Sequence, residues 1–212
     1  DIEPYFIELS KKKNKIMLYS EKTSTQLTAD LNQFLEKKFA PKITMHGVFV
    51  EMFGFGVLLT GRSGIGKSET ALELIHRGHR LITDDKVTFH EDPSGMVLGK
   101  ADKIPYFMEL RGIGIIDIKA LYGLGSVRNE KRLDAIIELK ELKNDDYLTK
   151  TNSKGVKVKV LGHHVVHAEL HISSGRNAAT MVETTIMNLI AIKYGYDSEK
   201  AYKGKIRHKD FI

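Results

Sequence analysis

Cysteine and tryptophan are both absent from this chain of 212 residues. Without cysteine there is no disulfide framework and no cysteine metal site, and a reducing cytosol is the expected setting. No apolar run approaches the ~20 residues that span a bilayer, and the first residues, Asp1-Ile2-Glu3-Pro4, do not resemble a signal peptide. These absences predict a cytoplasmic protein without a membrane partner.

The charge balance is mildly basic, with 33 Lys and Arg against 27 Asp and Glu and a net charge of +6. The basic residues are scattered in groups near Lys11–Lys13, Lys154–Lys159 and Lys203–Lys209, and no stacking aromatics are interleaved with them. We therefore predict no nucleic-acid partner. An acidic protein or a polyanionic substrate fits such a field as well.

The most informative stretch has the pattern G-x-x-x-x-G-K-S. Its residues are Gly61, Arg62, Ser63, Gly64, Ile65, Gly66, Lys67 and Ser68. The apolar run Val57–Thr60 before it suits a buried strand, and Glu69–Arg77 after it has helical apolar spacing, with Gly78 placed as a C-cap. Strand, glycine loop and helix form the context in which this motif binds phosphates.

Each part of the motif has a mechanical reason. The glycines let backbone N–H groups close around phosphate oxygens without Cβ clashes, and the start of the helix adds its positive dipole end. Lys67 supplies a point charge for the β- and γ-phosphates, and the Ser68 hydroxyl suits Mg²⁺. The motif predicts nucleotide or polyphosphate binding, with a plain glycine-rich turn as the alternative, but it does not say how the phosphate is used.

Residues 1–40 look separable from the rest. A short strand is expected over Lys15–Tyr19, and the hydroxyls of Thr23–Thr25 are N-cap candidates for a helix that ends at Ala40-Pro41. Because the first residue is not Met, the sequence is expected to be a piece of a longer chain.

From Lys42 onward the pattern changes to strands around the loop and its helix. Strands are predicted at Ile43–Phe53, Val57–Thr60, Arg80–Thr83, within 87–101, at Leu133–Leu139 and at Glu169–Ile172. A hairpin turn is expected at Gly54–Gly56, a mobile polar segment at 140–160, a helix after Asn177 that Gly195 closes, and a frayed tail from Lys203. The strand–helix–strand order predicts an α/β fold with a P-loop core. Because hairpins join antiparallel strands, the sheet is expected to be mixed rather than purely parallel.

Several further residues are candidates for chemistry. Asp84 and Asp85 follow a predicted strand at the sheet edge where ligands bind, so one carboxylate could take a proton from a hydroxyl or hold Mg²⁺. The alternative is a solvated turn. Glu109 and Arg111 precede Gly112 and Gly114; a carboxylate could reach Mg²⁺ and the glycines could let backbone approach a phosphate, or the segment is a plain strand–turn.

Two other groups are open to two interpretations each. The segment Ser173, Ser174, Gly175, Arg176 and Asn177 opens a helix and could bind a second phosphate, or it is only a capped helix start. The histidines of 163–171 suggest a metal cluster, but no metal-binding pattern accompanies them, and a structural metal is not predicted.

A string of motifs then occurs in a characteristic order. They are His46-Gly47-Val48, the glycine loop, Arg77-Gly78-His79-Arg80-Leu81 leading into Asp84-Asp85, Met108–Asp117, Gly125-Ser126-Val127-Arg128 with Lys131-Arg132-Leu133-Asp134, and Gly175-Arg176-Asn177. Over roughly residues 25–196 the chain resembles the HPr kinase/phosphorylase family of Gram-positive bacteria and their wall-less relatives. The Glu109–Asp117 block is highly specific to that family.

The resemblance implies an enzyme that uses ATP or pyrophosphate, with Mg²⁺, to phosphorylate a regulatory serine of HPr, the phosphocarrier protein of sugar uptake. It also implies removal of that phosphate by phosphorolysis, control of carbon catabolite repression, a cytoplasmic homohexamer and a fold that resembles phosphoenolpyruvate carboxykinase. By the same analogy, residues 1–40 are the tail of a truncated N-terminal domain plus a linker helix, and residues 41–212 are the P-loop catalytic domain.

The resemblance also implies roles for single residues. Asp85 matches the general base for phosphorylation, which becomes the general acid in reverse, and Lys67 matches the phosphate-binding lysine. Ser68 and Glu109 match the Mg²⁺ ligands, and His46 matches an active-site histidine that nothing in the composition marks. The Met108–Asp117 block matches a segment needed for both activities, and Ser173–Ala178 one tied to dephosphorylation.

Four positions depart from the family pattern. Arg62 stands where an acidic residue is usual, and Ser173-Ser174 stand where an Arg-Pro pair is usual. The catalytic arginine of the family falls near Lys150, a basic but non-equivalent residue. Of the two implied activities, phosphorolysis is the one that these departures are expected to weaken first.

Two rival functions remain open from the sequence. One is a kinase or carboxykinase that acts on a small molecule, which an assay with HPr against metabolites separates. The other is a nucleotide-dependent switch or nucleic-acid-binding module, which predicts no phosphate transfer to protein and salt-sensitive retention on nucleic acid.

Overall fold

The computed structural model describes residues 3–142, 154–173 and 177–209. The chain divides into two compact units, Asp1–Ala40 and Pro41–Ile212. Across the three described ranges, no helix is both long and apolar enough to cross a membrane.

The first unit contains two helices, α1 (Pro4–Lys12) and α2 (Ser24–Phe39). Thr23 caps α2 through a capping box: its hydroxyl accepts from the Gln26 backbone N–H, and the Gln26 side chain accepts from the Thr23 N–H. The predicted helix is therefore confirmed. The predicted strand at Lys15–Tyr19 is wrong, because no described strand pairs with that segment.

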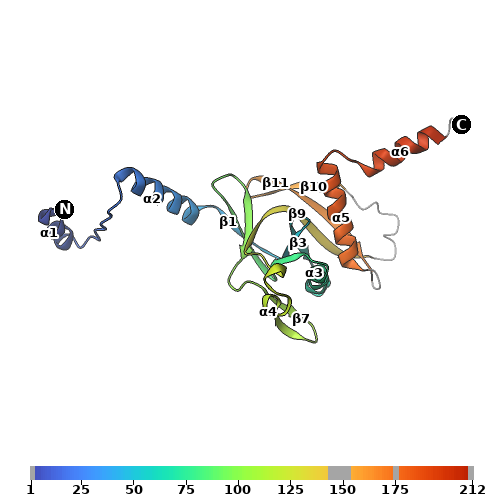
Figure 1. Ribbon diagram of the computed structural model, residues 1–212, viewed down its shortest axis with the longest axis horizontal. Helices are drawn as coiled ribbons and strands as arrows, with labels where there is room; N and C mark the ends of the chain where they lie inside the picture. Colours follow the sequence, from blue (N-terminus) through green and yellow to red (C-terminus); the bar gives the residue numbers. More distant parts are fainter. Residues whose placement is uncertain (1–2, 143–153, 174–176, 210–212) are drawn as a thin grey trace. The chain divides into compact units, whose positions relative to one another are not determined.

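The second unit is built on a large mixed sheet of nine strands, which confirms the predicted α/β class (Figure 1). The main path runs in the order β1-β5-β6-β9-β3-β2-β4, and β11 pairs with both β9 and β10. β9 is parallel to β3 and β11, whereas the other pairings are antiparallel. The strands are β1 (Lys42–His46), β2 (Val48–Met52), β3 (Phe55–Gly61), β4 (Arg80–Thr83), β5 (Lys86–Glu91), β6 (Val97–Ala101), β9 (Glu130–Glu141), β10 (Val156–Val160) and β11 (His163–Ile172).

Both faces of the central strands are buried. On one face Val48, Val50 and Leu59 pack with α3 (Lys67–His76) and α5 (Ala178–Lys193), two helices that contact each other. On the other face Phe49 and Leu58 join a second apolar cluster to which β5 and β6 contribute. A continuous apolar run in the sequence is the expected signature of a strand buried in this way.

The predicted strand Ile43–Phe53 is wrong as one element, because it breaks at Gly47. β1 pairs with β5, whereas β2 pairs with β3. A Cβ on Gly47 would lie 2.4 Å from the backbone oxygen of Leu59, so only glycine lets the two chains approach at this switch. The hairpin turn lies at Phe53-Gly54, and both residues have the positive φ that a tight hairpin turn requires.

The C-terminal part also differs from expectation. Val156–Val160 is a strand within the predicted mobile segment, and residues 143–153 of that segment lie outside the described residues. Residues 203–209 of the predicted frayed tail belong to helix α6 (Ser198–Lys209), and residues 210–212 lie outside the described residues. The strands predicted around Leu133 and Glu169 are both longer than expected, because β9 and β11 pair with each other over seven positions.

Gly99 on β6 supports an aromatic contact in the second apolar cluster. A Cβ at this position would lie 2.4 Å from Cε1 of Phe89 and 2.7 Å from Cε1 of Phe49, whose rings meet edge to face. We expect Gly99→Ala to lower the free energy of unfolding by about 1–3 kcal/mol, measured by urea denaturation, because the rings must shift.

Gly125→Ala is the matched control, since a Cβ there has no neighbour within 4 Å. An equal loss of stability in both variants would show that the ring contact is not responsible.

A small second sheet completes the unit. It is the hairpin of β7 (Phe107–Leu110) and β8 (Gly114–Asp117), which leads into the short helix α4 (Ile118–Tyr122) and a 3₁₀ turn at Leu124–Ser126. β7 contacts α3, so this hairpin lies beside the glycine loop.

Candidate active site

A cleft of about 530 Å³ lies where β3, β4 and the amino end of β2 meet at one edge of the sheet. Its lining combines the glycine loop with acidic and basic side chains from separate elements. The lining residues are His46, Gly47, Gly61, Ser63, Gly64, Gly66, Lys67, Ser68, Glu69, Asp84, Asp85, Glu109 and Arg111.

The loop joins β3 directly to α3, as the motif requires. Gly64 and Gly66 both have left-handed φ, +79° and +96°, and Gly66 is the N-cap of α3. The Lys67 ammonium donates to the carbonyl oxygens of Gly61 at 3.0 Å and Arg62 at 3.1 Å. Its positive charge therefore lies over the loop, where a phosphate group would be neutralised.

Asp84 is the half-buried member of the acidic pair. Its carboxylate accepts from Ser68 Oγ at 3.0 and 3.2 Å and from the backbone N–H groups of Asp85 and Glu109. Burial raises the pKa of Asp84 above its ordinary value, and the hydrogen bond from Ser68 offsets only part of this effect. Asp84 thus ties the start of α3, the end of β4 and β7 together.

Asp85 is the exposed member and points into the cleft with His46. Its side chain is 77% exposed, and Oδ1 lies 3.5 Å from Nδ1 of His46. The Gly47 N–H donates to the Asp85 carbonyl at 2.9 Å, and Asp85 has a positive φ of 71°. A non-glycine residue in this conformation raises the free energy of the folded state by on the order of 1 kcal/mol. The surrounding contacts therefore stabilise a strained backbone at Asp85. Its exposure makes the carboxylate accessible to a group on a second protein.

The β7–β8 hairpin supplies two further side chains to the cleft, Glu109 and Arg111. The Arg111 guanidinium packs against the loop, since a Cβ on Gly64 would come within 2.9 Å of its Nη2. Gly112 lies in the turn of the hairpin, and Gly114 is the first residue of β8, paired with Leu110. Neither glycine is among the residues that line the cleft.

A second cleft, of about 620 Å³, lies on the other side of the same loop. It is lined by Arg62, Gly64, Ile65, Gly66, Glu69, Thr70, Glu73, Glu141, Ile172, Ser173, Asn177, Ala178 and Ala179. Arg62, Ile65, Ser173 and Asn177 therefore do not share the first cleft with Lys67. Ser174, Gly175, Arg176 and Lys150 lie outside the described residues.

Asn177 begins α5 and ties it to α3. Its side-chain oxygen accepts from the Thr180 N–H at 2.8 Å, and its side-chain nitrogen donates to Glu73 at 2.6 Å. The interpretation of this residue as a helix cap is thus confirmed. Ser173 and Asn177, the two described ends of the predicted phosphate segment, both line the second cleft.

Sequence reasoning missed an ion network between the C-terminal end of α3 and α5. Arg77 pairs with Glu73 at 2.6 Å and with Glu183 at 2.5 Å, and the buried His79 lies 2.8 Å from Glu183. Burial alone would raise the pKa of Glu183, but its hydrogen bonds with His79 and Arg77 outweigh that effect, so the pKa lies below its ordinary value. Since Glu183 is more than a hundred positions from Arg77 and His79, no local spacing could have revealed it.

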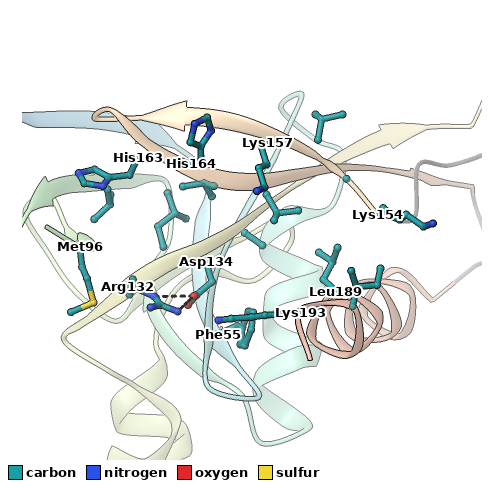
Figure 2. A pocket seen from close by; sticks show the side chains of 18 of the residues that line it. Phe55, Met96, Arg132, Asp134, Lys154, Lys157, His163, His164, Leu189 and Lys193 are labelled. Carbon is teal, nitrogen blue, oxygen red and sulfur yellow. Dashed lines mark hydrogen bonds and ion pairs between the residues drawn. The ribbon is translucent and has the colours of Figure 1, made fainter. Parts of the chain in front are cut away.

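A third cavity, of about 630 Å³, lies between β9, the β10–β11 pair and the end of α5 (Figure 2). The Arg132–Asp134 ion pair and Lys193 are among the residues that line it. The Lys193 ammonium lies 4.6 Å from the centroid of the Phe55 ring. This cavity contains none of the predicted site residues.

Two of the histidines on β11 lie beside carboxylates from other strands. His163 lies 3.0 Å from Glu91 and His167 lies 3.3 Å from Glu138. The described part of the chain contains no group of three or more His, Cys, Asp and Glu side chains able to hold a metal ion.

Comparison with known proteins gives a consistent result. The family model described as the HPr Serine kinase C-terminal domain matches residues 37–206. A protein of Fusobacterium nucleatum is 53% identical over 185 residues, which cover 87% of this chain but only 30% of that protein. The HPr kinase/phosphorylase of Caldanaerobacter subterraneus is 41% identical over 207 residues, covering 97% of this chain and 68% of that protein.

A solved structure shows the same fold. The Hpr(Ser) kinase/phosphatase from Coxiella burnetii superposes with a TM-score of 0.67 at 32% identity, covering 76% of this chain and 98% of that one.

Proposed function

The chain belongs to the HPr serine kinase C-terminal domain family, and from this premise we propose that it phosphorylates a regulatory serine of the phosphocarrier protein HPr. The proposed donor is ATP or pyrophosphate with Mg²⁺, and the proposed reverse reaction is phosphorolysis of phosphoserine-HPr. The proposed role is control of carbon catabolite repression. The glycine loop is proposed to act as a P-loop in a core that resembles phosphoenolpyruvate carboxykinase.

One observation carries the proposal: Lys67 of the loop and Asp85 at the strand end line the same cleft. In-line phosphoryl transfer needs a cradle for the transferred phosphate and a group that handles the proton of the attacking hydroxyl. The first cleft contains candidates for both, and the second and third cavities contain neither Lys67 nor Asp85.

The donor set in the cleft fits Mg²⁺. The Ser68 hydroxyl and the Glu109 carboxylate are hard oxygen ligands, and Mg²⁺ in such sites takes one or two carboxylates together with substrate phosphates. When bound, the ion would neutralise charge on the transferred phosphate. Asp84 holds the Ser68 hydroxyl in place through the hydrogen bonds described above.

In the forward direction, Lys67 and the loop amides hold the terminal phosphate, and Asp85 accepts the proton of the serine hydroxyl as its oxygen attacks phosphorus. His46, beside Asp85, orients that carboxylate. In reverse, an oxygen of inorganic phosphate attacks the phosphoserine phosphorus, the bond to the serine oxygen breaks, and protonated Asp85 returns its proton to that oxygen. Pyrophosphate is the second product.

The forward direction is the better supported of the two. Ser173-Ser174 stand where the family pattern has an Arg-Pro pair, so a cation expected near the loop is absent from the sequence at that point. Arg62, which stands where an acidic residue is usual, pairs with Glu141 in the second cleft.

The test is direct. Purified protein is incubated with HPr, Mg²⁺ and each donor in turn, and intact mass reports the phosphoryl group on HPr; addition of excess phosphate then tests the reverse step. Transfer to a small metabolite but not to HPr would overturn the proposal in favour of a small-molecule kinase. Binding of nucleotide without any transfer would favour a switch.

The assembly and setting are also proposals. We infer a cytoplasmic homohexamer from the family resemblance. The division of the chain after Ala40 supports assigning residues 1–40 to an N-terminal domain with a linker helix, separate from the catalytic domain.

Glu109 provides a test of the metal site. We expect Glu109→Gln to raise the Mg²⁺ concentration for half-maximal HPr phosphorylation at least ~10-fold, the loss that even outer-sphere changes at metal sites cause. A magnesium titration of initial rates measures it, and excess Mg²⁺ should restore part of the rate.

Glu169→Gln is the matched control, because Glu169 pairs with Lys140 at 2.6 Å and lines neither cleft beside the loop. An unchanged magnesium requirement in Glu109→Gln would remove Glu109 from the site.

A further inference from the structure

The large sheet divides into two branches along β9. β9 pairs with β6 over residues 130–132 and with β11 over residues 135–141, whereas Leu133 and Asp134 pair with neither of these strands. The third cavity lies where the branches separate (Figure 2), and both of them line it, with Val97 from β6 and Val165 from β11. It is therefore a space that the strand pairing itself leaves between the branches.

The walls of this cavity suit the apolar part of a ligand. Leu133, Val165 and Leu189 line it from β9, β11 and α5, and all three side chains are buried. The volume of about 630 Å³ lies within the ~300–1,000 Å³ of typical small-molecule sites. An apolar group placed here would be removed from water together with these walls, which is favourable.

The only carboxylate among the described residues that line the cavity already has partners. Asp134 pairs with Arg132, and its Oδ2 accepts from the backbone N–H of Gly56 at 3.1 Å. His163, at another edge of the lining, lies 3.0 Å from Glu91. The lining therefore offers no carboxylate that would repel an anion without a cation beside it.

Lysines give the lining an excess of positive charge. Lys154 pairs with Asp197 at 2.9 Å. Lys157 and Lys193 are both exposed, and within the described ranges neither of them forms an ion pair. The Lys193 ammonium lies over the ring of Phe55, so an aromatic contact holds this charge at the edge of the apolar space.

We propose that the third cavity binds an amphipathic anion, with its anionic head at Lys193 and its apolar body between the two branches of the sheet. The head is a carboxylate or a phosphate, because both accept charge-assisted hydrogen bonds from an ammonium group. Lys157, which lines the same cavity from β10, adds to the positive field.

This site is separate from the proposed active site. Phe55, the first residue of β3, lines the third cavity, whereas Gly61, the last residue of β3, lines the first cleft. The two sites thus lie at opposite ends of one strand. The inference does not rest on phosphoryl transfer, and a binding experiment without HPr tests it.

Lys193→Met tests the head of the site, because methionine keeps an apolar side chain but removes the ammonium. The probes are octanoate, octyl phosphate and the neutral octanol, each titrated into the full chain by calorimetry. We expect an anionic probe to bind once per chain and its affinity to fall about 5-fold or more in Lys193→Met, the loss of a charged hydrogen-bond partner. The affinity for octanol should not change.

The two anionic probes distinguish the possible heads. Binding of octanoate alone identifies a carboxylate ligand, and binding of octyl phosphate alone identifies a phosphate monoester. For the head that binds, the butyl analogue should bind about 10-fold or more weakly than the octyl probe, because each CH₂ that enters the cavity adds to the affinity. Equal affinities would show that the apolar walls are not used.

Lys119→Met is the matched control. Lys119 is also exposed, and its ammonium lies 6.0 Å from the centroid of the Tyr106 ring, but it lines none of the three cavities. Its affinities should equal those of the unchanged protein. Absence of anion binding, equal losses in Lys193→Met and Lys119→Met, or an equal loss for octanol would overturn the assignment.

The rate of HPr phosphorylation separates this inference from the proposed function. Lys193 lines neither cleft beside the glycine loop, so Lys193→Met should retain the full rate when no probe is present. Failure of HPr phosphorylation in the unchanged protein would leave the binding results intact.

Discussion

Asp85→Asn is expected to lower the rate of HPr phosphorylation by about 10²–10⁴-fold, the contribution of a positioned general base. The amide cannot accept the proton of the serine hydroxyl, whereas the loop, Lys67 and Ser68 remain as they are. Initial rates with HPr and ATP measure the loss, and calorimetry should show that ATP binding survives. The reverse reaction should fall as well, because the same side chain returns the proton.

The chain contains a matched control for this variant. Asp85 and Asp92 stand immediately before and after β5, at its opposite ends. Asp92 lies in the turn of the β5–β6 hairpin, where it accepts from Ser94 and Met96, so Asp92→Asn should retain full activity. Full activity in Asp85→Asn would remove that carboxylate from the mechanism.

Lys67→Met is expected to lower kcat/KM by about 10²–10³-fold with ATP and with pyrophosphate alike, as loss of a positioned charge at the transferred group does. Methionine retains much of the side-chain length but removes the ammonium that lies over the loop. Because the proposed role of Lys67 is to hold phosphates that both donors carry, the choice of donor should not matter. Steady-state rates with each donor measure the effect.

The control is Lys86→Met, since Lys86 is an exposed lysine on β5 that is not among the lining residues of the first cleft. A selective loss with ATP alone in Lys67→Met would contradict the assigned role. The two variants thus separate the proposed roles: Asp85→Asn is expected to impair transfer while ATP binding survives, and Lys67→Met is expected to impair the reaction with both donors.

Features that depend on neighbours in the sequence were predicted correctly. The strand, loop and helix around Lys67, the N-cap among Thr23–Thr25 and the cap at Asn177 all use hydrogen bonds that span a few residues. The mixed sheet was also predictable, because apolar runs and turn residues indicate where strands begin and end. The errors at Lys15–Tyr19 and Val156–Val160 share one cause: a strand exists only where another strand pairs with it.

The sequence by itself determined the glycine loop between a strand and a helix, the acidic strand end and, through its motifs, the family. Only the tertiary structure decided that Asp84 is half-buried and accepts a hydrogen bond from Ser68, whereas Asp85 is exposed beside His46. Strand pairing and burial are set by contacts between distant segments. It also decided that one loop serves two clefts, because the wall of the second comes from β9, β11 and the start of α5. Such contacts join residues far apart in the chain, and local pattern carries no information about them.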